Sequence, residues 1–408
     1  MKKVELLAPA GDLEKLKIAV MYGADAVYFG GESFSLRAGA GNFTLDEMKE
    51  GIAFCHERGV KCHMALNIFA HNEDIGPFTE YLRSVKDLGI DAFIAADPGV
   101  IDMIWEVMPD AEVHLSTQAN MTNYRTAKFW HDRGIRRLVL ARELTLEEIR
   151  EMRENIPPDM ELEAFVHGAM CISYSGRCLL SNFMIERDAN RGMCAHPCRW
   201  KYALVEQQRP GEYYPVEEDD RGTYIMNSKD LCLIEHLPQL IDAGISSFKI
   251  EGRMKSVFYV ATVVSAYRKA IDSYLADPQS YSFRQQWMED LCKASHREFT
   301  TGFYFHKPDN LDQNYRTSDY TRDYSFVGIV KSYDPDTGYA KVEQRNKMVL
   351  GDRVELFGPM TDFFEQEISE MYDEEGEAIS SAPHPQQIIK IKMAKLVEPF
   401  FMLRKRKE

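Results

Sequence analysis

The sequence predicts an α/β fold, a (β/α)8 TIM-like barrel with a long cysteine-rich insertion, followed by a small C-terminal β-barrel. Short apolar runs alternate with amphipathic helical stretches over the first 280 or so of the 408 residues. A helix, a glycine and a strand follow one another repeatedly, in the segments YGADAVYF, LGIDAFIA, RGIRRLVL and AGISSFKI. Eight such units predict a parallel barrel with its site at the carboxyl ends of the strands.

The individual elements follow from local patterns along the chain. The eight barrel strands are expected at 4–9, 25–31, 61–69, 91–97, 112–120, 136–143, 161–168 and 246–252. Helices are expected between them at 12–24, 44–59, 79–89, 99–108, 124–134 and 145–155. Asp12 can cap the first helix, and Thr44 with Glu47 predicts a capping box on the second. Left-handed helix ends are expected at Gly23, Gly89, Gly134 and Gly244.

A doubly wound open sheet is the rival fold. That fold requires a glycine-rich phosphate-binding turn after its first strand, whereas the segment APAGD contains a single glycine. The closed barrel is therefore favoured.

The domain boundaries are expected where the periodicity of apolar residues along the sequence changes. The barrel is expected over 1–280, and its seventh connection holds the insertion at 171–222, where no clean periodicity is found. A loop of this length inside a compact domain is uncommon and is often functional. After a connector at 281–325, short alternating strands separated by Gly and Asp turns predict the β-barrel at 326–408.

Composition bounds the functional class. The chain begins MKKVELLAPAG, without an apolar signal core, and no stretch approaches the roughly 18 apolar residues of a membrane span. These features predict a cytoplasmic protein with no membrane partner. The formal net charge of −15 gives no global electrostatic reason to bind nucleic acid, so an RNA-binding role needs a local basic surface.

The cysteines are the most informative residues. Four of the eight lie within 28 residues of one another, at Cys171, Cys178, Cys194 and Cys198, and Cys232 follows. A reducing compartment disfavours disulfides, so such density indicates a soft metal centre. Structural zinc sites usually present two short C-x2–4-C pairs, and only one is present here, so spacing favours an iron–sulfur cluster over zinc. Buried free thiols explain Cys55, Cys62 and Cys292.

The segment EAFVHGAMCISYSGRCLLS, residues 163–181, resembles the signature of the collagenase-like peptidase family, the unknown-catalytic-type peptidase family thirty-two. The segments APAG, NSKDL and FKIEGRMKS resemble that family too, so the resemblance covers essentially the whole chain. The length and the C-terminal segment are most similar to the tRNA hydroxylation proteins within the family.

The resemblance implies a [4Fe–4S] cluster and an activity. Its ligands would be Cys171, Cys178, Cys194 and Cys232, with Cys198 as an alternative ligand. The activity would be O2-independent hydroxylation of the tRNA wobble uridine to 5-hydroxyuridine, with prephenate, a small dicarboxylate, as co-substrate. Relatives hydroxylate a ribosomal RNA cytidine or ubiquinone precursors. Besides tRNA, a second copy of the chain or a paralogue is expected as a partner in an oligomer.

Strand alternation nominates further site residues. In ELEAFVHG the apolar set suits the helix side, which places Glu163 and His167 in the barrel interior or at its mouth. The predicted catalytic residues are Glu163, His167 and Glu251, although a buried glutamate–arginine pair can equally be structural. The predicted substrate-binding residues, near strand ends, are Arg37, Asn67, Gln118, Asn120 and Arg253. A guanidinium fork suits a carboxylate or a phosphate.

Two basic groups are candidates for contact with RNA. One lies within the segment YRTAKFWHDRGIRR and the other in the C-terminal RKRK. The predicted RNA-binding residues are Arg133, Arg136, Arg137, Arg404 and Lys405. Charges that complement a helix dipole, or a solvated tail, are the structural alternatives.

Two other functions stay open at this point. A peptidase is one, but the chain has no H-E-x-x-H and no G-x-S-x-G motif, and cysteines committed to iron cannot act as nucleophiles. A metal-stabilised RNA-binding module without catalysis is the other.

Overall fold

The computed structural model describes residues 4–35, 42–171, 173–200, 228–306 and 320–407, together with four short strands. Those strands are β8 (Leu204–Val205), β9 (Tyr213–Tyr214), β10 (Glu218–Asp219) and β11 (Gly222–Thr223). Among the described residues, no helix has both the length and the apolar character needed to cross a bilayer.

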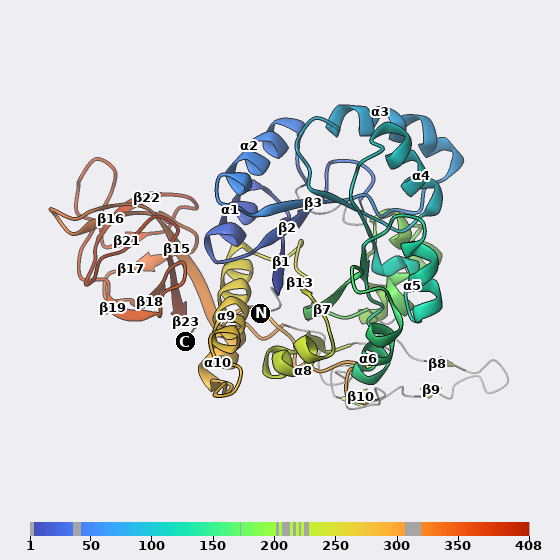
Figure 1. The fold of residues 1–408 in the computed structure, drawn as a ribbon. Helices are drawn as coiled ribbons and strands as arrows, with labels where there is room; N and C mark the ends of the chain where they lie inside the picture. The colour runs from blue at the N-terminus through green and yellow to red at the C-terminus, as the bar shows by residue number, and fades with distance from the viewer. Residues whose placement is uncertain are drawn as a thin grey trace.

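A closed ring of eight parallel strands forms the first domain, as the sequence predicted (Figure 1). The ring closes because the last strand pairs with both the first and the seventh. Its members are β1 (Glu5–Pro9), β2 (Ala26–Phe29), β3 (Lys61–Ala65), β4 (Ala92–Ala95), β5 (Val113–Leu115), β6 (Arg137–Val139), β7 (Glu161–Ala169) and β13 (Ser247–Ile250). Every predicted barrel strand is present, which confirms the fold class.

Helices surround this ring. They are α1 (Leu13–Met21), α2 (Leu45–His56), α3 (Ile75–Val85), α4 (Pro98–Val107), α5 (Tyr124–His131), α6 (Leu146–Asn155), α8 (Leu237–Asp242), α9 (Val257–Ala276) and α10 (Gln285–Lys293). The predicted caps form: Asp12 accepts a hydrogen bond from the Lys15 backbone, and Thr44 and Glu47 make a reciprocal capping box. All four predicted glycines have positive φ, between +82° and +104°, which L-residues rarely adopt.

Two strands that the sequence did not predict extend the sheet beyond the ring. β12 (Asp230–Cys232) runs antiparallel to β7, and β14 (Phe299–Thr300) pairs with β12. β7 also has a register irregularity against β13, since Lys249 lies opposite Phe165 whereas the next residue, Ile250, lies opposite His167. A bulge of this kind re-aims the side chains that follow it.

The C-terminal domain is an antiparallel half-barrel. Its seven-stranded sheet has the order β19–β18–β23–β15–β16–β22–β20. These strands are β15 (Tyr324–Asp334), β16 (Tyr339–Gln344), β18 (Arg353–Phe357), β19 (Phe364–Glu367), β20 (Met371–Tyr372), β22 (Ile388–Lys392) and β23 (Met402–Arg406). A separate pair joins β17 (Met348–Val349) to β21 (Ser381–Ala382).

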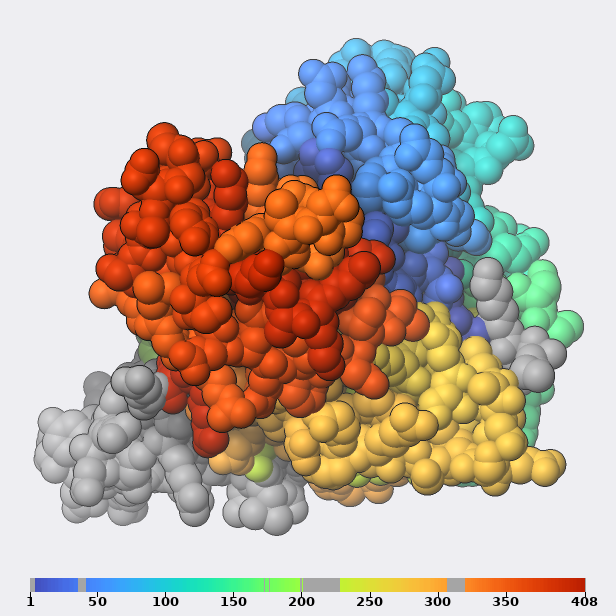
Figure 2. Space-filling model, turned by 90° about the vertical axis from the view of Figure 1, so that its left-hand side faces the viewer, coloured from blue at the N-terminus to red at the C-terminus, as the bar shows by residue number. Residues whose placement is uncertain are grey.

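The half-barrel packs against the outside of the first domain, over α1, α9 and α10 (Figure 2). The Tyr22 hydroxyl of α1 donates to the Phe400 carbonyl oxygen at 2.9 Å. Lys293 of α10 donates to Glu355 at 3.0 Å. Both contacts lie on the helical surface of the barrel.

Candidate functional site at the barrel mouth

A small cavity lies at the carboxyl ends of the barrel strands, where the fold class predicts a site. Its walls are polar side chains that follow or end strands, above a floor of apolar ones. The lining residues are Tyr28, Ala65, Asn67, Ile94, Ser116, Thr117, Gln118, Val139, Arg142, Phe165, Lys249, Glu251 and Arg253. Three of the predicted substrate-binding residues therefore converge here, namely Asn67, Gln118 and Arg253.

Arg253 is held rigidly at this cavity. Its side chain is buried, and its Nη2 donates to Ser35 Oγ at 2.9 Å. The backbone beside it packs closely on the segment APAG, because a Cβ on Gly11 would lie 2.1 Å from the Arg253 carbonyl oxygen. Across the cavity, Asn67 Nδ2 donates to Gln118 Oε1 at 3.3 Å. Preorganised donors of this kind suit an anionic ligand.

Arg142 and Glu251 form the boundary between this cavity and a larger one. The guanidinium of Arg142 lies 3.9 Å from the Phe165 ring centroid, and its Nη1 donates to the Ala169 carbonyl oxygen at 2.9 Å. Its Nη2 lies 3.9 Å from Glu251 Oε2. Both residues line both cavities, as do Thr117 and Gln118. The two cavities are therefore contiguous.

The larger cavity, of about 480 Å³, is lined by cysteines. Cys171, Cys178, Cys194 and Cys198 all contribute to its wall, and all eight cysteines of the chain are thiols. The four are not gathered round one point, since among the described residues they form no group of ligand atoms within 4.8 Å of one another. Four thiols spread around a cavity suit a polynuclear cluster, in which each thiolate binds its own iron.

Backbone amides point at two of these sulfurs. The Leu180 amide donates to Cys178 Sγ at 3.3 Å, and the His196 amide donates to Cys194 Sγ at 3.4 Å. Hydrogen bonds to sulfur stabilise thiolates and tune the clusters that they hold. The pKa of the Cys171 thiol is raised, chiefly by loss of hydration, although the Ser173 backbone and the charge of Arg142 act to lower it. This arrangement fits a group that binds thiolates.

Polar contacts fix the insertion that carries these cysteines to the barrel, and two of them use barrel carboxylates. Glu143, after β6, accepts hydrogen bonds from the Ser175 amide at 2.6 Å and from its hydroxyl at 3.0 Å. Asp74, before α3, accepts two hydrogen bonds from Arg191 at 2.7 and 2.9 Å. These contacts hold the cysteine segment over the carboxyl ends of the strands.

Cys232 is not brought to this cavity. It lies on β12 opposite His167, is buried, and its Sγ is 3.9 Å from the Tyr267 hydroxyl of α9. Burial raises the pKa of its thiol to about 12. The family resemblance implied Cys232 as a ligand and Cys198 as the alternative, whereas in the structure Cys198 lines the cavity with the other three thiols.

Two of the predicted catalytic residues also lie elsewhere. Glu163 is fully buried in the barrel interior, where Lys249 donates to it at 2.7 Å, and it lines neither cavity. His167 follows the bulge in β7 and packs on the helix side, with Nδ1 3.4 Å from the Tyr267 hydroxyl. Burial lowers the pKa of His167 to about 3. Strand alternation placed it inward, and the bulge reverses that placement.

Neither predicted RNA-binding group forms an exposed basic patch. Arg137 is buried and pairs with Glu161 at 2.6 Å, and Arg404 is buried and pairs with Glu355 at 2.7 Å. Lys405 pairs with Asp352 at 2.7 Å. The remaining two are exposed but locally engaged, with Arg136 near Asp159 and Arg133 over the Phe129 ring. The burial of Arg137 and Arg404 contradicts their assignment to RNA, while contact of Arg133, Arg136 and Lys405 with RNA stays a prediction.

The structure does not support the other two predicted substrate-binding residues, Arg37 and Asn120. Arg37 lies outside the described residues. Asn120 has a left-handed conformation, with φ of 53°, at the end of the turn after β5, and it lines neither cavity.

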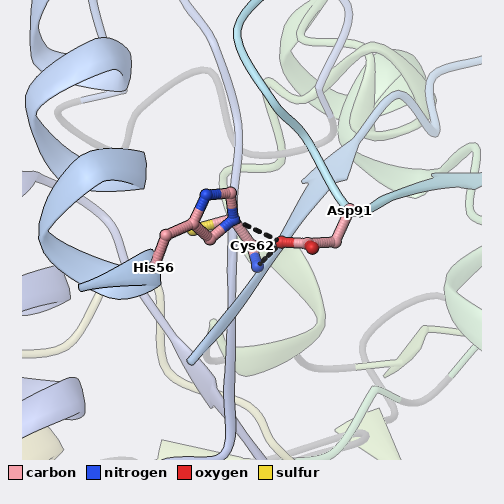
Figure 3. A group of neighbouring side chains, drawn as sticks. All are labelled: His56, Cys62 and Asp91. Carbon is pink, nitrogen blue, oxygen red and sulfur yellow. Dashed lines mark hydrogen bonds and ion pairs between the residues drawn. The ribbon is translucent and has the colours of Figure 1, made fainter. Parts of the chain in front are cut away.

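A second group of metal-ligand types lies at the opposite end of the barrel (Figure 3). Asp91 Oδ2 accepts hydrogen bonds from the Cys62 amide at 2.7 Å and lies 2.9 Å from His56 Nε2. The hydrogen bond to Cys55, and then burial, raise the pKa of the Cys62 thiol well above its usual value. Asp91 thus links His56 to the Cys62 backbone. Cys55 and Cys62 are both buried, as predicted.

Sequence reasoning missed three features of the site. Arg142 follows β6 in the segment LARE, and its place after a barrel strand was a usable signal. Lys255 lies at the start of the connection to α9, with its Nζ 3.9 Å from the Tyr320 ring centroid, and both line the larger cavity. The insertion also exposes several large apolar side chains around the cavity, which no periodicity could place.

Comparison with known proteins gives consistent matches. Residues 11–314 match the profile of Peptidase family U32, and residues 322–404 match that of the Peptidase family U32 C-terminal domain. The chain is 47% identical over 406 residues to tRNA hydroxylation protein P1 of Bacillus subtilis, covering 100% of this chain and 96% of that protein. It is 39% identical to tRNA hydroxylation protein P of Escherichia coli, covering 94% and 92%. It is 33% identical to a protein named Collagenase in Porphyromonas gingivalis, covering 90% and 89%.

Proposed function

The chain belongs to peptidase family U32, and on that premise we propose that it is a tRNA-modifying enzyme that hydroxylates uridine at the wobble position. The names of the B. subtilis and E. coli relatives support tRNA hydroxylation. The observation that carries the proposal is the contiguous pair of cavities, one rich in thiols and one lined by buried polar and cationic groups. A thiol-lined cavity and a separate ligand pocket are what a cluster-dependent modification requires.

The thiol-lined cavity fits a [4Fe–4S] cluster. Cys171, Cys178, Cys194 and Cys198 would hold it, because all four line this cavity and two of them already accept hydrogen bonds from backbone amides. A bound cluster would supply electron transfer or a Lewis-acidic iron. Replacement of the uridine C5–H bond by C5–OH removes two electrons from the base, which agrees with the need for a redox centre.

The smaller cavity fits a dicarboxylate such as prephenate. Arg253 and Arg142 supply two guanidinium groups on its walls, and Asn67 and Gln118 supply amides. Glu251 lines both cavities, so its carboxylate is placed to accept a proton from a base that enters the larger one. In this arrangement the chain binds the co-substrate inside the barrel and presents it toward the thiol-lined cavity.

The fourth cluster ligand can be tested with two serine variants. We expect Cys198→Ser to lose most of its iron after anaerobic purification, because its thiol lies in the cavity wall. Cys232→Ser is the matched variant and should keep its iron, because Cys232 packs against Tyr267 outside the cavity. Iron and sulfide content per chain and the visible absorption spectrum measure both. The reverse pattern would assign the fourth place to Cys232.

Arg253→Ala is expected to lower 5-hydroxyuridine formation by roughly 10- to 100-fold, since a hydrogen bond to a charged group contributes about 1.5–3 kcal/mol. Ser35→Ala is the control, because it removes the hydrogen-bond partner of Arg253 but leaves the guanidinium. This variant should lower 5-hydroxyuridine formation less than Arg253→Ala does. Nucleoside mass spectrometry of cellular tRNA gives the readout. Unchanged 5-hydroxyuridine in Arg253→Ala would exclude an essential role.

The function as a whole is tested in a strain that lacks its own tRNA hydroxylation proteins. Expression of this chain should restore 5-hydroxyuridine in tRNA, measured by nucleoside mass spectrometry. If the tRNA still lacks 5-hydroxyuridine although the expressed protein is folded and iron-loaded, the proposal is contradicted. The expected oligomerisation with a paralogue stays a prediction.

One contact favours a second candidate, a thiol peptidase. Cys194 Sγ lies 3.9 Å from His196 Nδ1, and a thiol beside an imidazole is the usual nucleophile pair of such enzymes. Hydrolysis of denatured collagen by iron-free protein, lost in His196→Ala, would support this candidate.

A further inference from the structure

The surface around the cysteine-lined cavity is unusually rich in exposed apolar side chains. Within residues 173–200, six large apolar side chains are exposed, and they include three aromatic ones. Phe183 is the most exposed large apolar residue of the described chain, at 85%. The six are Tyr174, Leu179, Phe183, Met184, Met193 and Trp200. A concentration of this kind on a soluble surface marks a binding site.

These side chains adjoin the opening of the cavity. α7 (Leu180–Ile185) forms part of the wall, because Leu180 lines the cavity and Ser181 is fully buried, while Phe183 faces outward. Met193 lines the cavity and is itself exposed. Met254, on the loop after β13, also lines the cavity, and 57% of its surface is exposed. The exposed surface is therefore continuous with the interior of the cavity.

Charge distinguishes this surface from the rest of the chain. Residues 171–200 contain four arginines and only two acidic residues, in a chain with a net charge of −15. Arg187 is exposed and lines the cavity, and its Nε donates to the Met193 carbonyl oxygen at 3.1 Å. Lys255 adds a second cation to the lining. Cations and exposed aromatic rings within the same segment match a polyanion whose bases can stack.

We propose that Tyr174, Phe183 and Trp200 form a stacking platform for the unpaired bases of an RNA loop, which delivers one base into the cysteine-lined cavity. The proposal rests on the proposed function and names the surface that the tRNA uses. Sequence-specific recognition of RNA targets single-stranded loops whose bases stack on aromatic side chains. A platform at the opening would hold the bases that flank the target base, and Arg187 would contact an intervening phosphate.

The test measures binding of a fluorescently labelled anticodon stem-loop to the full, iron-loaded chain. Phe183→Ala should weaken binding by roughly 5- to 150-fold, the range for loss of one stacked base. Phe183→Trp should retain the wild-type affinity, whereas Phe183→Leu, which keeps apolar area but no ring, should not. Because Phe183 is exposed, these variants should keep the wild-type iron content and melting temperature. Phe129→Ala, an exposed aromatic residue on α5, is the matched control and should bind normally.

The outcomes separate this inference from the proposed function. Wild-type affinity in both Phe183→Ala and Trp200→Ala would overturn the platform, while the wild-type protein still modified tRNA. Full affinity in Phe183→Leu together with lost self-association in Phe183→Ala would overturn it in favour of a protein-binding surface. Failure of the wild-type chain to bind the stem-loop would overturn the proposed function and the platform together.

Discussion

Replacement of Cys178 by serine is expected to abolish both iron binding and tRNA hydroxylation. Its sulfur lies in the wall of the larger cavity and accepts a hydrogen bond from the Leu180 amide. Serine keeps the size of the side chain but supplies a hard hydroxyl in place of a soft thiolate, which iron–sulfur clusters require. We expect iron per chain and 5-hydroxyuridine in tRNA to fall to background, with the cluster absorption lost as well.

The control for this result is Cys292→Ser. Cys292 lies on α10, is partly buried and lines neither cavity, so its replacement should leave iron content and modification unchanged. The fold of Cys178→Ser should also persist, since Cys178 N and O bond the Asn190 side chain through the backbone, which serine retains. A wild-type iron content in Cys178→Ser would show that this cavity does not hold the cluster.

Arg137→Met is expected to destabilise the protein by about 3–5 kcal/mol, the cost of breaking a buried ion pair by removing one partner. Arg137 is the first residue of β6, at the amino end of the barrel strands. Its guanidinium is 2.6 Å from Glu161 and 3.5 Å from the fully buried Glu163. Lys249 would remain as the partner of Glu163, at 2.7 Å. Chemical denaturation of the purified variant measures the loss. Arg136→Met is the matched control. The Arg136 guanidinium is exposed, so its loss should change the free energy of unfolding little.

The cost of Arg137→Met should depend on pH. Burial alone would raise the pKa of Glu163, but Lys249 and Arg137 outweigh it and hold the pKa below its usual value. In the wild type this carboxylate therefore stabilises the fold above its unfolded pKa, and the stabilisation is lost as pH falls through the folded pKa. Without Arg137 the folded pKa rises. The stability gap between the two proteins should narrow as pH falls below the ordinary glutamate pKa of 4.5, and a constant gap would contradict this account.

Most of the fold was determined by the sequence because its signals are local. A strand of four or five apolar residues, a helix with one apolar face and a glycine at the helix end each depend on neighbouring residues only. For that reason all eight barrel strands, the caps at Asp12 and Thr44, and the four positive-φ glycines were predictable. The density of cysteines after β7 is local too, and it led to the larger cavity.

The roles of individual site residues were decided by tertiary structure. Strand alternation assigned His167 to the barrel interior, but a bulge in β7 turned it to the helix side. Basic residues near one another in the sequence suggested an RNA surface, yet Arg137 found its carboxylate partner on β7 and Arg404 found one on β18. Such partners lie far along the chain, so spacing cannot reveal them.

The cysteines show the same division. The sequence established that soft ligands gather after β7, because composition and spacing are read along the chain. Only the structure places Cys198 in the cavity wall and Cys232 behind the ring, because an unpredicted antiparallel strand, β12, carries Cys232 against α9. The choice of thiol depends on the direction in which a strand faces, and pairing between distant segments sets that direction.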